Sequence, residues 1–84
     1  MKKVQLDVLS DALNLCVIRM PDRQYPGILI QGDALLAITN HAKRAHERAR
    51  TLNDPDLIRA TGNLLVTLEE YLEHYTKICR QNEG

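Results

Sequence analysis

Two arginines in the segment from Arg19 to Asp33 have side chains suited to binding an anion. Arg19 and Arg23 are close enough in the chain to grip one carboxylate or phosphate, because each guanidinium donates several N–H groups in a fixed fork. Tyr25 adds a flat apolar ring with a hydroxyl group, a frequent contact in protein interfaces. The segment therefore predicts a binding surface for a partner or an anionic ligand, formed by Arg19, Arg23, Tyr25, Gln31, Gly32 and Asp33.

A structural role for the same charges is the alternative. Arg19 or Arg23 would then pair with Asp22 or Asp33 and only hold the loop in place. Backbone amides near Gly32 precede a predicted helix, and helix N-termini bind anions. Asp33 would fill that place with its own carboxylate, and no glycine-rich nucleotide-binding pattern accompanies it. Capping is therefore the favoured role for Asp33.

Metal and nucleophilic chemistry are not predicted, and no cofactor is expected. Cys16 and Cys79 both fall in apolar rows, where a thiol behaves as a small hydrophobic group rather than as a nucleophile. The spacing of the histidines matches no metal-binding motif, so a surface or boundary position is expected for His41, His46 and His74.

A run of basic residues forms a second candidate surface. It comprises Lys43, Arg44, Arg48, Arg50 and Arg59. Arg44 and Arg48 share one face of a predicted helix, and Arg59 should reach the same end of a helical hairpin. The acidic run at 69–73 lies farther along the chain. The charges either form two solvated faces or steer a partner into place.

Composition sets the class of protein. The chain has 84 residues, enough for one domain (1–84) with a small core, and oligomerisation is a common way to stabilise so small a domain. A formal net charge of +0 argues against a dedicated nucleic-acid binder. Two cysteines do not make a disulfide scaffold, and neither a signal peptide nor a membrane span is evident. A cytoplasmic location is therefore expected.

The elements that position these residues begin with short strands. Residues 3–9 alternate between apolar and polar, as in a strand with one buried face, and residues 10–14 supply turn chemistry. Residues 15–18 are apolar on both sides and predict a more central strand, which Pro21 ends. The two strands should form an antiparallel hairpin, with a third short strand at 28–30.

A helical pattern follows Asp33, the expected N-cap. Asp54 and Pro55 provide the N-cap and first residue of a second helix. The first helix has one apolar row, at Leu35, Ile38, Ala42, Ala45, Ala49 and Leu52. The second has two rows, one at Leu57, Thr61, Leu64, Leu68, Tyr71, Tyr75 and Ile78, the other at Ile58, Leu65, Leu72 and Cys79. One row can pack on the first helix, and the other must cover the sheet or another subunit.

The loop segment also resembles a family of short, uncharacterised bacterial proteins that share a domain of unknown function. The shared pattern is Arg-x-Pro-x-Arg-x-x-Pro-Gly, a short apolar run and Gln-Gly-Asp, met here by Arg19, Pro21, Arg23, Pro26, Gly27, Gln31, Gly32 and Asp33. Ala34 stands where members of the family often have serine, so no serine-based role is carried over. The resemblance implies bacterial origin and a shared fold, and it supplies no activity.

The sequence thus predicts an α+β fold, with an antiparallel sheet of two or three strands (3–32) packed on a long antiparallel helical hairpin (33–80). The leading functional hypothesis is a non-enzymatic interaction or regulatory module. Such a module would act as a homo-oligomer or on a partner protein, for example as an immunity-type neutraliser. The alternative is a domain that binds a small anionic ligand through the loop from Arg19 to Asp33. Nucleic-acid binding by the basic residues is the weakest hypothesis.

Overall fold

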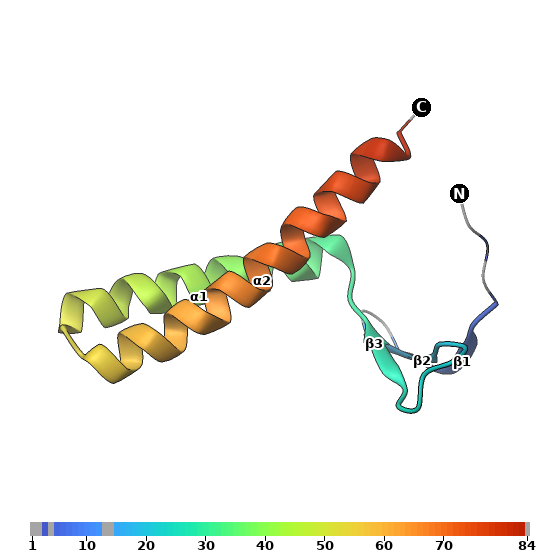
Figure 1. Cartoon of the computed structure of the whole chain (residues 1–84), viewed down its shortest axis with the longest axis horizontal. Coiled ribbons are helices and arrows are strands. Elements are labelled where there is room, and N and C mark those ends of the chain that lie inside the picture. Colours follow the sequence, from blue (N-terminus) through green and yellow to red (C-terminus); the bar gives the residue numbers. More distant parts are fainter. Residues whose placement is uncertain (1–2, 4, 13–14, 84) are drawn as a thin grey trace. The chain divides into compact units, whose positions relative to one another are not determined.

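The computed structural model describes residues 3, 5–12 and 15–83 of the chain. Three strands precede two helices in the order β1, β2, β3, α1, α2 (Figure 1). The chain divides into two compact units, residues 1–31 with the strands and residues 32–84 with the helices. The three-stranded antiparallel sheet followed by two helices that pack together confirms the predicted α+β class.

The sheet places β2 in the centre, as the apolar character of its sequence predicts. Its strands are β1 (Asp7–Ala12), β2 (Leu15–Arg19) and β3 (Gly27–Leu29), and both neighbouring pairs are antiparallel. Val17 lies opposite Ile28 in the pairing of β2 with β3. The third strand is therefore a paired strand, one residue earlier than the predicted 28–30.

The first strand differs from its prediction. It begins at Asp7 and runs to Ala12, through much of the expected 10–14 turn, whose remaining residues 13 and 14 lie outside the described part of the chain, as does residue 4. Val8 pairs with Ile18 and Ser10 with Val17, so Leu9 is an extra residue in a β-bulge. A bulge interrupts the alternation of side chains. Val8, predicted to be buried, is exposed, as is Leu9.

A tight turn follows β2. The Arg23 amide donates a hydrogen bond to the Met20 carbonyl at 3.3 Å, which closes a four-residue turn with Pro21 in its second position. Asp22, in the third position, has a φ of 66°. Proline followed by a residue with positive φ is the pattern of a type II turn. The loop thus has a defined path from Met20 to Arg23.

The helices begin and end at capping residues. α1 spans Gly32–Leu52 and α2 spans Pro55–Gln81. Asp54 caps α2 as predicted, because its carboxylate accepts hydrogen bonds from the amides of Asp56 and Leu57, each at 3.1 Å. Asp33 differs from its prediction by one position, because α1 starts at Gly32 and Asp33 lies inside the first turn. Its carboxylate nevertheless accepts a hydrogen bond from the Ala34 amide at 2.8 Å, as predicted for an N–H group of the first turn, and its negative charge favours the helix dipole.

An inner seam joins the two helices. Its α1 side chains are Leu35, Thr39, Ala42, His46 and Ala49, and its half-buried α2 residues include Ile58, Thr61, Leu65, Leu68 and Leu72. The predicted row on α1 is therefore partly wrong, because Ile38, Ala45 and Leu52 are exposed. Spacing alone allowed either set; the antiparallel packing on α2 selects the row at 35, 39, 42, 46 and 49.

One cross-helix hydrogen bond fixes the register of the seam. Nδ1 of His46 lies 2.9 Å from the Thr61 hydroxyl, which itself lies 2.8 Å from the Leu57 carbonyl. Which of the two groups donates between the ring and the hydroxyl depends on the tautomer of His46. In this register Ala42 lies level with Leu65.

Candidate functional site

Part of the predicted loop site lines a shallow depression. Its volume is about 460 Å³, and it is lined by Met20, Arg23, Gln24, Tyr25 and Gly27. Arg23 and Tyr25 therefore lie together, as the sequence predicts for a binding surface. Arg19 is exposed at the end of β2 and does not line the depression.

The other predicted loop residues fall at the boundary between the two units. Gln31 is the last residue of the unit that holds the strands. Gly32 and Asp33 are the first two residues of α1 in the other unit. A side chain at Gly32 would collide with the ring of Tyr75 on α2, so this glycine allows a close approach of the two helices. Packing against Tyr75 therefore explains why residue 32 is a glycine.

Pairing with Asp22 is one form of the alternative role for the loop arginines, and the described residues contain no such ion pair. Across residues 3, 5–12 and 15–83, the single ion pair joins Arg59 to Asp56 at 3.5 Å. Both partners are well exposed, and such a pair contributes little to stability. Arg59 is thus partly neutralised within the predicted basic patch.

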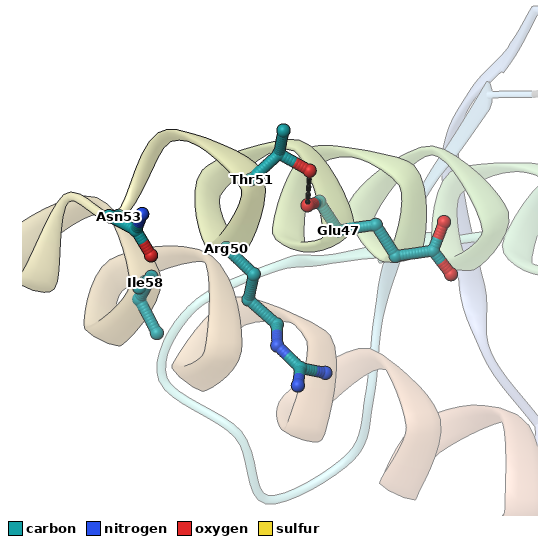
Figure 2. A pocket seen from close by; sticks show the side chains of 5 residues that line it. All are labelled: Glu47, Arg50, Thr51, Asn53 and Ile58. Atoms are coloured by element: carbon teal, nitrogen blue, oxygen red, sulfur yellow. Dashed lines mark hydrogen bonds between the residues drawn. The ribbon is translucent and has the colours of Figure 1, made fainter.

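The rest of the basic patch lies on the exposed surface of α1. Lys43, Arg44, Arg48 and Arg50 are all exposed, and a nitrogen of the Arg44 guanidinium lies 3.1 Å from Nδ1 of His41. Arg50 also lines a polar depression of about 540 Å³ at the tip of the hairpin, with Glu47, Thr51, Asn53 and Ile58. Figure 2 shows the Arg50 side chain reaching towards α2, while the Glu47 carboxylate points away along α1. The patch therefore mixes both signs of charge.

The largest feature of the helical unit is an exposed apolar surface, here called the outer face. On α2 it consists of a row in which every seventh residue is apolar: Leu57, Leu64, Tyr71 and Ile78. These side chains are 40–60% exposed. On α1 the matching row is Ile38, Ala45 and Leu52, also at intervals of seven. No charged residue interrupts either row.

The two rows lie on the same side of the hairpin. Each row residue directly precedes an inner-seam residue: Ile38 precedes Thr39 on α1, and Leu64 precedes Leu65 on α2. In an antiparallel pair of helices, equivalent flanking positions fall on one side of the seam. The outer face is therefore one continuous strip two helices wide. The other side of the seam is mostly charged and polar, with Leu36 and Val66 as isolated apolar side chains.

The outer face continues past the start of α1. The last turns of α2 extend beyond the first turn of α1 (Figure 1). There a depression of about 560 Å³ is lined by Tyr71, His74, Tyr75, Ile78 and Cys79. Cys79, predicted to be buried, is exposed because no part of α1 lies opposite this end of α2 in the hairpin.

Cys79 also alters the acidity of a tyrosine in this depression. The thiol raises the pKa of Tyr75 above its usual value of 10.0, mainly through a hydrogen bond and then through its own charge. Partial desolvation and the Asp33 carboxylate act in the same direction. The neutral phenol is therefore the favoured form, and it presents a hydrogen-bonding group within an apolar surface.

Within the described part of the chain, no three His, Cys, Asp or Glu side chains are grouped so that they could hold a metal ion. Neither helix is both long and apolar enough to cross a lipid bilayer.

Sequence reasoning found the outer face only in part. The presence of two apolar rows on α2 signalled that one would lack a partner on α1. The missed residues were Ile38, Ala45 and Leu52, which were assigned to the inner seam. Assigning Thr39 and His46 to the inner seam would have left Ile38, Ala45 and Leu52 on the exposed side of α1. The sequence signal for that assignment was the pair of polar residues His46 and Thr61.

The chain belongs to a family of unknown function, DUF6959, whose model matches residues 1–84. This match agrees with the expected resemblance to a domain of unknown function. No curated protein and no solved structure matches the chain. The comparisons therefore assign neither a substrate nor a partner.

Proposed function

We propose that this member of DUF6959 is a non-enzymatic interaction module that binds protein through the outer face of its helical hairpin. The observation that supports the proposal is the continuous apolar strip formed by the rows at 38, 45 and 52 and at 57, 64, 71 and 78. Burial of apolar surface contributes about 25 cal/mol per Å², so such a strip favours association. Extended exposed apolar patches are typical of interaction sites.

The composition of the outer face supports the same conclusion. Interface centres are depleted of charged residues and enriched in tyrosine. The outer face has no charge in either row and includes Tyr71. The charged residues Lys43, Arg50 and Glu69 lie away from it and keep the opposite side of the hairpin hydrated. This division suits a module with one contact surface.

The biological setting belongs to the proposal as well. We place the protein in the bacterial cytoplasm, where it would act as a homo-oligomer or as a regulator of a partner protein. Neutralisation of a toxic partner, as small bacterial immunity proteins perform, is one form of this activity. We also propose that the segment from Arg19 to Asp33 is a feature shared by the family.

Capture from a cell lysate tests the proposal. Full-length tagged protein would be compared with Leu64→Glu on the outer face and with Val66→Glu on the opposite side. The two positions are matched, since Leu64 is 53% and Val66 is 54% exposed on the same helix. We expect Leu64→Glu to abolish a specific association that Val66→Glu retains. Equal association by all three proteins would contradict a role for the outer face.

Binding of a small anion is the second candidate function. The supporting observation is the depression lined by Arg23 and Tyr25, in which the guanidinium and a phenol are available to one ligand. A thermal-shift screen of anionic metabolites and inorganic phosphate would test it. A ligand should raise the melting temperature of the wild type and of Arg44→Ala, and not that of Arg23→Ala. A broad panel without any shift would contradict it.

A further inference from the structure

We infer that the outer face is covered by a second copy of the same chain, so that two hairpins pack face to face as a four-helix bundle. The inference rests on the proposed interaction function and names its partner. The helical spacing is the first reason. On α2 the row at Leu57, Leu64, Tyr71 and Ile78 keeps a strict interval of seven residues, and the α1 row at Ile38, Ala45 and Leu52 keeps the same interval. An interval of seven returns each side chain to the same face of a helix, as in the seam of a helical bundle.

The shape of the outer face is the second reason. It is two helices wide, and a second identical strip rotated by two-fold symmetry presents the same width and length. Two-fold dimers are the commonest homo-oligomers, and their interface uses the same patch on both subunits. The α2 row from Leu57 to Ile78 is about 33 Å long and the α1 row from Ile38 to Leu52 is about 22 Å long at the rise of an α-helix. With helices packed about 8–10 Å apart, each copy contributes about 500 Å².

That area reaches the lower limit for a specific interface. A biological interface should bury at least about 1,000 Å² in total, and two outer faces together supply about 1,000 Å². Charge adds no obstacle, because the formal net charge of the chain is +0 and copies do not repel one another at long range. The face also lacks the charges that would select an oppositely charged partner.

The small interior of the hairpin is the third reason. The buried side chains of α1 are Leu35, Thr39, Ala42 and Ala49, and α2 has no fully buried residue. Domains of this size gain stability from oligomerisation when their own core is small. A second copy would bury the leucines and tyrosines that α1 leaves exposed on α2.

Sedimentation equilibrium of the purified full-length protein tests the inference. The chain has a mass of 9.6 kDa, and we expect the wild type to sediment at twice this value at micromolar concentrations. Leu64→Glu should weaken the dimer at least about 100-fold, because each copy would bury an unpaired carboxylate. Val66→Glu, on the opposite side, should change the dimerisation constant by less than about twofold.

A second variant keeps the test decisive if Leu64→Glu fails to fold. Ile78 lies near the end of α2 that extends past α1, so Ile78→Glu leaves the inner seam untouched (Figure 1). Circular dichroism would confirm that its helix content is unchanged, and its dimer should also weaken at least about tenfold. A dimer that persists in both Leu64→Glu and Ile78→Glu would show another interface and overturn the inference.

A monomeric wild type would also overturn the inference. The stability of Leu64→Glu relative to Val66→Glu would then show whether the proposed interaction function still holds. If Leu64→Glu unfolds at the same denaturant concentration as Val66→Glu, the face is free for a different protein and the interaction function stands. If Leu64→Glu is far less stable in that monomer, the chain covers the face itself and both proposals fail.

Discussion

Both apolar surfaces of α2 have leucines seven residues apart, Leu65 and Leu72 in the inner seam and Leu57 and Leu64 on the outer face, yet only the inner seam is packed within the hairpin. The inner seam meets α1 through small residues such as Ala42 and Ala49, which let the helices come close. The outer face instead presents large side chains such as Leu64 and Tyr71 to solvent. Apolar periodicity therefore occurs on a packed face and on an exposed one, whereas residue size indicates how closely another helix can approach.

The strongest test of this comparison uses two adjacent leucines of α1. Leu35 is 8% exposed in the inner seam, and Leu36 is 48% exposed outside it. Leu35→Ala should lower the free energy of unfolding by about 2–5 kcal/mol, because it removes buried methyl groups and leaves a cavity. Leu36→Ala should lower it by less than about 1 kcal/mol. Urea denaturation measures both, and equal losses would show that the seam is not the core of the hairpin.

A pair of alanines provides the converse test. Ala49 is 0% exposed in the inner seam, whereas Ala45 lies on the outer face. Ala49→Leu should destabilise the protein by about 1–3 kcal/mol, since the added atoms have no space between the helices. Ala45→Leu should change the stability of the monomer by no more than about 0.5 kcal/mol. A tolerated Ala49→Leu would mean that the helices are not in close contact at the tip.

The sequence predicted the order and type of the elements because the strongest local signals lie at their ends. Asp54 and Pro55 start α2 where expected, and Pro21 follows the end of β2. The strand β1 was misplaced because the bulge at Leu9 depends on its pairing with β2. Pairing of this kind is a tertiary property that alternation along one strand does not encode.

The candidate site was less predictable than the fold. Arg23 and Tyr25 lie together because a short turn positions them, and turn residues are visible in the sequence. The exposure of Ile38 depends on which of two overlapping rows meets α2. The antiparallel packing on α2 makes that choice, and it places His46 and Thr61 in the seam, where they share a hydrogen bond that hydrophobic patterning does not register.

The polar contact in the seam gives the third prediction. A methyl group added at Gly62 would lie 3.2 Å from Cε1 of His46, closer than ordinary packing allows. In the His46→Ala background, Gly62→Ala should stabilise the protein by about 0.5–1 kcal/mol through its better helix propensity. With His46 present, crowding should remove at least about 0.5 kcal/mol of that gain. A double-mutant cycle measures this coupling, and identical effects in the two backgrounds would place His46 outside the seam.

The smallest effect concerns the phenol of Tyr75 at the free end of α2. Its pKa in the folded protein lies above the usual 10.0, chiefly because of Cys79. The stability that this raised pKa contributes is complete below pH 10 and is lost as the pH rises through the pKa of the folded protein. In a protein with Tyr25→Phe and Tyr71→Phe, the ultraviolet absorbance of tyrosinate reports Tyr75 alone, since the chain has 3 tyrosines.

Removal of the thiol by Cys79→Ala should lower that titration midpoint towards 10.0. If a second copy covers the depression, desolvation should also make the midpoint higher in the dimer than in the monomeric Leu64→Glu variant, whose new carboxylate lies outside the depression. An unchanged midpoint in Cys79→Ala would exclude the contact between the thiol and the phenol. An equal midpoint in dimer and monomer would show that Tyr75 stays hydrated, and the covered part of the outer face would then have to end before the last turns of α2.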